Sequence, residues 1–175
     1  MKNIFIGFIL IFLDFNLNIN NSQIDLIPDF VGYIVMIRGI NEMIEKSTFF
    51  MKVRPYVTAV AVYSGVLYLL DLVGTYKSLG VLTYILAIIS TTAHLYISYN
   101  IVMGVLDMEG IYNIYLNGDR LKSIWTAYAI LNVLTFMFML FPPAAIFCII
   151  ITFIVAICFL IDFNKTKNLY YDSIG

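Results

Sequence analysis

The sequence predicts an all-α fold, a polytopic membrane helix bundle with about six transmembrane helices. The chain has 175 residues, of which 62% are hydrophobic and only 12% are charged, against roughly 45 to 50% and 25% in soluble globular domains. The apolar residues gather in six segments, most of them close to the ~20 residues that cross a bilayer as a helix. The segments are 4–19, 27–45, 55–73, 79–104, 124–141 and 143–162. Residues 1–175 are therefore predicted to form a single transmembrane domain.

The first segment is the shortest and contains a carboxylate, Asp14. A cleavable signal peptide would end at a small-residue site, whereas this apolar stretch continues Leu13-Asp14-Phe15-Asn16. We therefore expect a retained first helix over 4–19.

Prolines mark the expected starts of several later helices. Proline is tolerated in the first helical turn, because its missing N–H has no partner there in any case. Pro28 and Pro55 lie at the starts of the second and third apolar segments, and Pro142 and Pro143 lie at the start of the sixth. Asn117-Gly118-Asp119 supplies turn and capping residues, so the fourth helix is expected to end before it and the fifth to start after it.

Residues 105–122 are predicted to form a cytoplasmic amphipathic arm. Ile111, Ile114 and Tyr115 recur there at helical spacing among acidic residues. Such a pattern is typical of a helix that extends from the fourth segment and lies near the lipid headgroups.

Lysine and arginine residues indicate the orientation, because short cytoplasmic loops carry an excess of them. With both termini in the cytoplasm, Lys77 alone lies outside and Arg38 lies within a span. The other basic residues are then cytoplasmic: Lys2, Lys46, Lys52, Arg54, Arg120, Lys122, Lys165 and Lys167. The net charge of -1 excludes a basic surface for nucleic acid, so the lipid bilayer is the expected partner, together with any protein that binds the arm.

Four polar residues fall within the predicted spans, about 10 to 15 Å from the cytoplasmic end at ~1.5 Å per residue. They are Asp14, Arg38, His94 and Asn132. An ionisable group in a span costs about 2.5 to 3.5 kcal/mol on insertion scales, so each needs a partner or a function. Asp14 and Arg38 either pair across the first helical hairpin, or Arg38 extends to the interface and pairs with Glu42.

Polar stripes on three consecutive helices predict either a small hydrated pocket or a hydrogen-bond network that locks the bundle. The pocket would be lined by Ser64, Tyr68, Ser90, Thr91, Ser98 and Tyr128. Small residues should allow close helix packing at Gly32, Gly39, Ala61 and Gly65. The polar residues from Asn16 to Asp29 lack EF-hand spacing and are predicted to form a solvated turn that caps the second helix.

The stretch NINNSQIDLIPDFVGYIVMIRGINEM, from Asn18 to Met43, resembles a signature of small, uncharacterised six-helix membrane proteins of Gram-positive bacteria. In those proteins an I-D-x-x-P-D-F-x-G-Y segment leads into the second helix. Similarity extends to Phe50–Pro55 and Gly104–Tyr112. The resemblance implies a multi-pass protein of the bacterial cytoplasmic membrane and no assigned activity.

The sequence thus predicts a non-enzymatic membrane protein without a cofactor or metal site, because it has no nucleophile elbow, phosphate loop, HExxH or paired-cysteine motif. Its polar intramembrane layer would bind a small solute or lock the bundle. One alternative is the substrate-binding subunit of a vitamin-importer type transporter, although the first helix lacks the paired alanines with which such subunits dock their energising partner. The other is a membrane assembly or partner-binding factor that uses residues 105–122.

Overall fold

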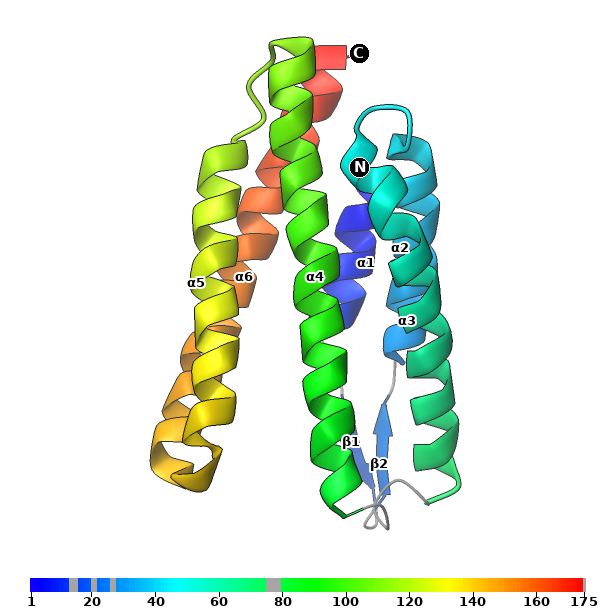
Figure 1. The fold of residues 1–175 in the computed structure, drawn as a ribbon, viewed down its shortest axis with the longest axis vertical. Helices are drawn as coiled ribbons and strands as arrows, with labels where there is room; N and C mark the ends of the chain where they lie inside the picture. Colours follow the sequence, from blue (N-terminus) through cyan, green and yellow to red (C-terminus); the bar gives the residue numbers. More distant parts are fainter. Residues whose placement is uncertain (13–15, 20–21, 26–27, 75–79, 175) are drawn as a thin grey trace. The chain divides into compact units, whose positions relative to one another are not determined.

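The computed structural model is helical, with one short two-stranded hairpin (Figure 1). It describes residues 1–12, 16–19, 22–25, 28–74 and 80–174. Within these ranges three helices are long and apolar enough to cross a membrane, which identifies the chain as a membrane protein. They are α3 (Thr48–Leu72), α4 (Val81–Tyr112) and α6 (Pro142–Ile174).

The chain divides into two compact units, Met1–Ile97 and Ser98–Gly175. Helix α4 therefore begins in the first unit and ends in the second.

In the first unit, α1 (Lys2–Phe12) leads into strand β1 (Asn16–Ile19), which pairs antiparallel with β2 (Ser22–Asp25) before α2 (Asp29–Met43) begins. The first helix is thus shorter than the predicted 4–19. Asparagine alternates with an aliphatic residue over Asn16–Ile19. This two-residue period favours a strand, and asparagine is a poor residue for a helix interior.

Three glycines bring the backbones of α1 and α2 together. A Cβ atom at Gly39 would lie 2.5 Å from the backbone nitrogen of Ile4, and one at Gly32 would lie 2.7 Å from Cγ1 of Ile11. From the other side, a Cβ at Gly7 would lie 2.8 Å from Cβ of Met36. Only residues without a side chain fit at these positions, so the two helices form a tightly packed pair.

Helix α3 begins seven residues before the predicted start at Pro55. The Ser47 hydroxyl accepts a hydrogen bond from the Phe49 backbone N–H at 3.2 Å and so caps the helix. Pro55 therefore lies inside α3 rather than in its first turn. Its ring leaves the carbonyl of Met51 without a helical donor, at a turn where Met51 is exposed.

In the second unit, the end of α4 is followed by α5 (Gly118–Met137), a 3-10 turn η2 (Phe138–Leu140) and α6. Both final helices are longer than the predicted 124–141 and 143–162. The predicted arm over 105–122 is divided: α4 continues to Tyr112, and α5 begins at Gly118. Some of the apolar side chains of residues 105–122 lie on the surface, and the others are buried in the core of the second unit.

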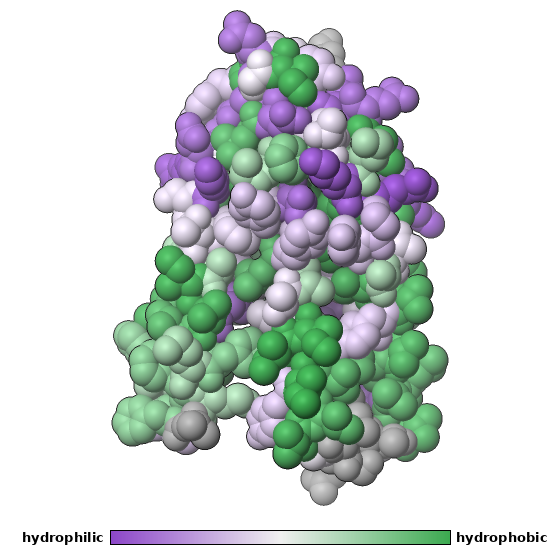
Figure 2. Space-filling model, in the orientation of Figure 1, coloured by the Kyte–Doolittle hydropathy of each residue, from purple (hydrophilic) through white to green (hydrophobic). Residues whose placement is uncertain are grey.

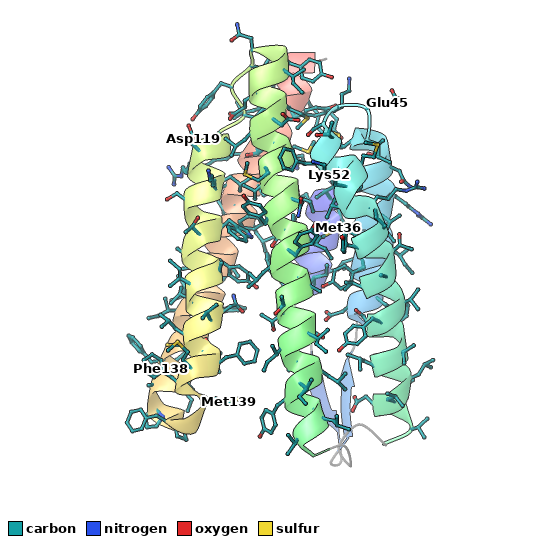
Figure 3. All side chains as sticks on the ribbon, in the orientation of Figure 1. Met36, Glu45, Lys52, Asp119, Phe138 and Met139 are labelled. Carbon is teal, nitrogen blue, oxygen red and sulfur yellow. The ribbon has the colours of Figure 1, made fainter. Side chains whose placement is uncertain are left out.

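Polar and apolar residues separate along the helices of each unit. Hydrophilic residues gather at one end, and hydrophobic residues cover the other (Figure 2). Glu45 and Lys52 mark the hydrophilic end of the first unit, near the connection of α2 to α3, and Asp119 marks that of the second (Figure 3). Phe138 and Met139 lie at the opposite end of α5. This division is typical of a helix bundle with one end in water and its length in lipid.

Candidate functional site

His94 is buried in the first unit, where it meets side chains of α1 and α2. Its Nδ1 atom lies 3.4 Å from the hydroxyl oxygen of Tyr33, with which it shares a hydrogen bond. The rings of Phe12 and His94 meet in an edge-to-face arrangement, with centroids 5.2 Å apart. The Tyr33 hydroxyl and the His94 imidazole are both buried away from water and bond to each other, so this pair links α2 to α4.

The other members of the predicted polar layer have different surroundings. Arg38 is exposed, and Glu42 accepts a hydrogen bond from the Asn3 amide at 2.6 Å. Glu42 also lies 3.9 Å from the amino group of Met1. Burial lowers the pKa of that amino group, and the Glu42 carboxylate opposes the shift. Among the described residues Glu42 thus pairs with α1 and not with Arg38, while Asp14 lies outside the described residues.

Asn132 belongs to the second unit and not to the unit of His94. Its side-chain amide donates a hydrogen bond to the carbonyl of Tyr128 on its own helix, at 2.9 Å. Tyr128 itself is buried. This hydrogen bond of the amide is therefore made within α5.

The predicted pocket-lining residues are held mainly by helix backbones and aromatic rings. The Ser64 hydroxyl donates to the carbonyl of Val60 at 2.8 Å, and Tyr68 packs against the ring of Phe30. In the second unit Ser98 accepts a hydrogen bond from the Trp125 indole at 2.9 Å. Ser90 and Thr91 are half-buried on α4, and Ala61 is buried on α3. Such bonds fix hydroxyl groups within and between helices.

The most extensive polar network lies where α4 turns into α5, at residues 109–120, which we call the α4–α5 corner. One carboxylate oxygen of Glu109 accepts hydrogen bonds from the backbone N–H groups of Leu116, at 2.6 Å, and Gly118, at 3.1 Å. Asn113 and Asn117 adopt the left-handed conformation that ends α4 and starts α5. The predicted break between the helices is found there, but Glu109 supplies the capping side chain.

Asp162 of α6 completes this network, although its side chain is almost fully buried. It lies 3.1 Å from Nε of Arg120 and 3.9 Å from Nζ of Lys165. It also accepts a hydrogen bond from the Asn117 amide at 3.3 Å. A buried carboxylate needs such partners, because an unpaired charge away from water is strongly unfavourable. The sequence reasoning overlooked it, though Asp162 is the one charged residue of 143–162.

An open pocket of about 640 Å³ lies at the surface of the α4–α5 corner. Its lining combines carboxylate, amide, guanidinium and aromatic groups. The lining residues are Glu109, Asn113, Ile114, Tyr115, Asn117, Asp119 and Arg120. No group of three His, Cys, Asp or Glu residues suited to a metal ion occurs in the part of the chain that the structure describes. The corner offers hydrogen bonds, charge of both signs and exposed apolar side chains, which together suit recognition of another molecule.

Comparison of the chain with protein-family models, curated proteins and solved structures gave no match.

Proposed function

We propose that this chain is a non-enzymatic, multi-pass protein of the bacterial cytoplasmic membrane that binds a protein partner through the α4–α5 corner. In this proposal the chain crosses the membrane about six times, both termini are cytoplasmic, and the corner faces the cytoplasm. The resemblance of residues 18–43 to small membrane proteins of Gram-positive bacteria supports the location. Within the spans, the bonds of His94 with Tyr33 and of Ser98 with Trp125 lock helices together.

The length of two helices carries the proposal. α4 has 32 residues and α6 has 33, which makes them about 48 and 50 Å long. The hydrocarbon core of a bilayer is about 30 Å thick, so each helix extends about 15 to 20 Å beyond it, allowing for ordinary tilt. The charged residues gather at the end near the corner, and this end is therefore the one that projects into water.

The projecting end is a folded structure with its own core. Met108, Leu116 and Phe163 are fully buried there. The hydroxyl of Thr166 donates to the Leu116 carbonyl at 2.8 Å, which ties the corner to α6. Together with the bonds of Glu109 and Asp162, these contacts hold the corner in one conformation. A preorganised surface of this kind loses little entropy when it binds a partner.

Apolar side chains stand exposed on this projecting end. Tyr115 is 72% exposed and Ile111 59%, close to the open pocket. Aromatic residues surrounded by polar groups are typical centres of protein interfaces. The corner therefore favours the partner-binding alternative over the solute pocket, in which the Ser64 and Ser98 hydroxyls already have hydrogen-bond partners.

Photo-crosslinking in native membranes tests the proposal. A photoreactive amino acid at Tyr115 should give one adduct of defined mass, and the charge reversal Lys122→Glu should weaken it at least tenfold. The matched control position is Ile149, which is exposed on the apolar part of α6. Adducts that are absent, or that are the same from both positions, would contradict the proposal. Arg120→Glu is unsuitable for this test, because Arg120 neutralises the buried Asp162.

A further inference from the structure

The exposed ring of Tyr115 is held in a fixed place at the pocket of the α4–α5 corner. Its hydroxyl donates a hydrogen bond to the side-chain oxygen of Asn117 at 3.1 Å, and the Asn117 amide donates in turn to the buried Asp162. The Tyr115 side chain nevertheless stays 72% exposed and lines the pocket. A ring that is anchored at its hydroxyl and open elsewhere is a prepared contact surface, because little side-chain entropy remains to be lost on binding.

Asp119 adds a carboxylate to the same pocket. It lies in the first turn of α5, at the hydrophilic end of the second unit (Figure 3), and its side chain is exposed. Within the ranges that the structure describes, no hydrogen-bond donor or basic side chain is bonded to this carboxylate. An ionised carboxylate can accept several hydrogen bonds, so Asp119 is able to bind a donor from another molecule.

The charges around the pocket favour a cation. The charged residues of its lining are Glu109, Asp119 and Arg120, which are two carboxylates against one guanidinium. Nε of Arg120 lies 3.1 Å from the Asp162 carboxylate, which compensates the charge of this guanidinium. The Glu109 carboxylate accepts two backbone N–H groups, and these leave its negative charge in place. The pocket therefore has an excess of negative charge, which attracts a positively charged group.

An arginine side chain matches these groups better than a lysine side chain does. A guanidinium is planar, stacks on aromatic rings and donates two parallel N–H bonds to a carboxylate. A lysine ammonium is a strongly hydrated point charge without this shape. The pocket offers the Tyr115 ring, the Asp119 carboxylate and, as a further acceptor, the exposed amide of Asn113. Its volume of about 640 Å³ is in the range of ligand pockets.

We infer that the pocket of the α4–α5 corner binds an arginine side chain of the protein partner. The guanidinium stacks on the ring of Tyr115 and donates to the carboxylate of Asp119. The inference rests on the proposed function, since the arginine belongs to the partner that binds the corner. Lys122 does not line the pocket, so its charge reversal tests another part of the same contact.

A short peptide tests the pocket without the native partner. The probe is Gly-Arg-Gly, acetylated and amidated, and the matched control peptide carries citrulline, which has the shape of arginine but no charge. Ligand-observed NMR on the protein in nonionic detergent should show at least tenfold weaker binding of the citrulline peptide, because the charge-assisted bond to the carboxylate is lost. Equal binding of the two peptides, or no binding of either, would overturn the inference. This comparison uses the unchanged chain and does not depend on the folding of a variant.

Two variants assign the binding to the two groups. Asp119→Asn should weaken the binding of the arginine peptide at least tenfold, because it removes the charged acceptor. Tyr115→Leu should weaken it about two- to fivefold, the size of a cation–π contact at an exposed site. The matched control is Asp172→Asn, at another exposed carboxylate of the second unit, and it should leave the binding unchanged. Equal effects of Asp119→Asn and Asp172→Asn would mean that only the overall charge matters, which contradicts a specific arginine site.

Crosslinking separates a failure of this inference from a failure of the proposed function. A photoreactive amino acid at Ile111, which is exposed outside the pocket lining, leaves Tyr115 and Asp119 intact. Asp119→Asn should then reduce the adduct from Ile111 at least tenfold. An undiminished adduct would overturn the arginine contact while the partner surface stands. No adduct from either Ile111 or Tyr115 would contradict the proposed function, and the partner's arginine with it, even where the peptide binds.

Discussion

The missing side chain of Gly39 allows α2 to reach the backbone of α1. A Cβ at this position would lie 2.5 Å from the Ile4 nitrogen and 3.0 Å from the Asn3 carbonyl carbon, and neither atom can move without moving the helix. Gly65 of α3 is different, because a Cβ there would meet Phe30 at an ordinary 3.9 Å. Glycine is therefore required at one predicted packing position and replaceable at the other.

Substitution by alanine should separate these two positions. Gly39→Ala should lower the free energy of unfolding by about 1 to 3 kcal/mol, because it overpacks a backbone contact. Gly65→Ala should leave it unchanged or raise it by up to about 1 kcal/mol through its better helix propensity. Denaturant unfolding in detergent micelles measures both. Equal losses at the two positions would mean that the contact of α1 with α2 is not limited by space.

At the residue scale, a sequence reveals which polar groups need partners but not which partners they have. His94 stands out as the one histidine, whereas Tyr33 is one of 13 tyrosines and lies 61 residues away. Asp162 and Asn117 are 45 residues apart. These pairs depend on how one helix packs against another. The helical periodicity of a single segment contains no information about this packing.

The α4–α5 corner is an element whose shape depends on one side chain. Glu109 holds two backbone N–H groups, seven and nine residues along the chain. A Cβ at Gly118 would lie 2.5 Å from the second Glu109 oxygen, so a larger residue there would displace the Glu109 side chain. The corner should therefore lose its order when this carboxylate is removed.

Glu109→Ala should raise the hydrogen-exchange rates of the Leu116 and Gly118 amides by about ten- to a hundredfold. This corresponds to the ~1 to 3 kcal/mol that buried donors lose with their acceptor. Exchange followed by mass spectrometry on the detergent-solubilised protein measures the change. Glu45→Ala, at an exposed acid of the first unit, should leave these two amides unaffected. Unchanged exchange in Glu109→Ala would mean that the backbone alone fixes the corner.

At the element scale, the helical fold and three helices able to cross a membrane confirm the coarse prediction. The boundaries were less predictable. The Ser47 cap starts α3 seven residues ahead of Pro55, so this proline does not mark the start of the helix. The polar pattern around Asn16 and Asn18 indicated a turn, but the strand pairing there depends on partners across the hairpin.

For the whole molecule, the number of crossings and the orientation stay predictions, and reporter fusions test them. Alkaline phosphatase, which is active only outside the cytoplasm, should be active when fused after Gly74 and inactive when fused after Ile174. A fluorescent protein that folds only in the cytoplasm should give the reverse result. The expectation follows from Lys165 and Lys167, which lie near the fusion site after Ile174. An active phosphatase after Ile174 would reverse the orientation or change the number of crossings.

The close backbone contact of α1 with α2 also has a consequence for biogenesis. α1 has 11 residues and is about 16 Å long, too short to be stable across a bilayer alone. Its partner glycines, Gly32 and Gly39, are synthesised later, so α1 has no packing surface until α2 has left the ribosome. The two helices should then enter the lipid together as one unit, and ribosome-bound chains that stop before Gly39 should remain extractable from the membrane by alkali.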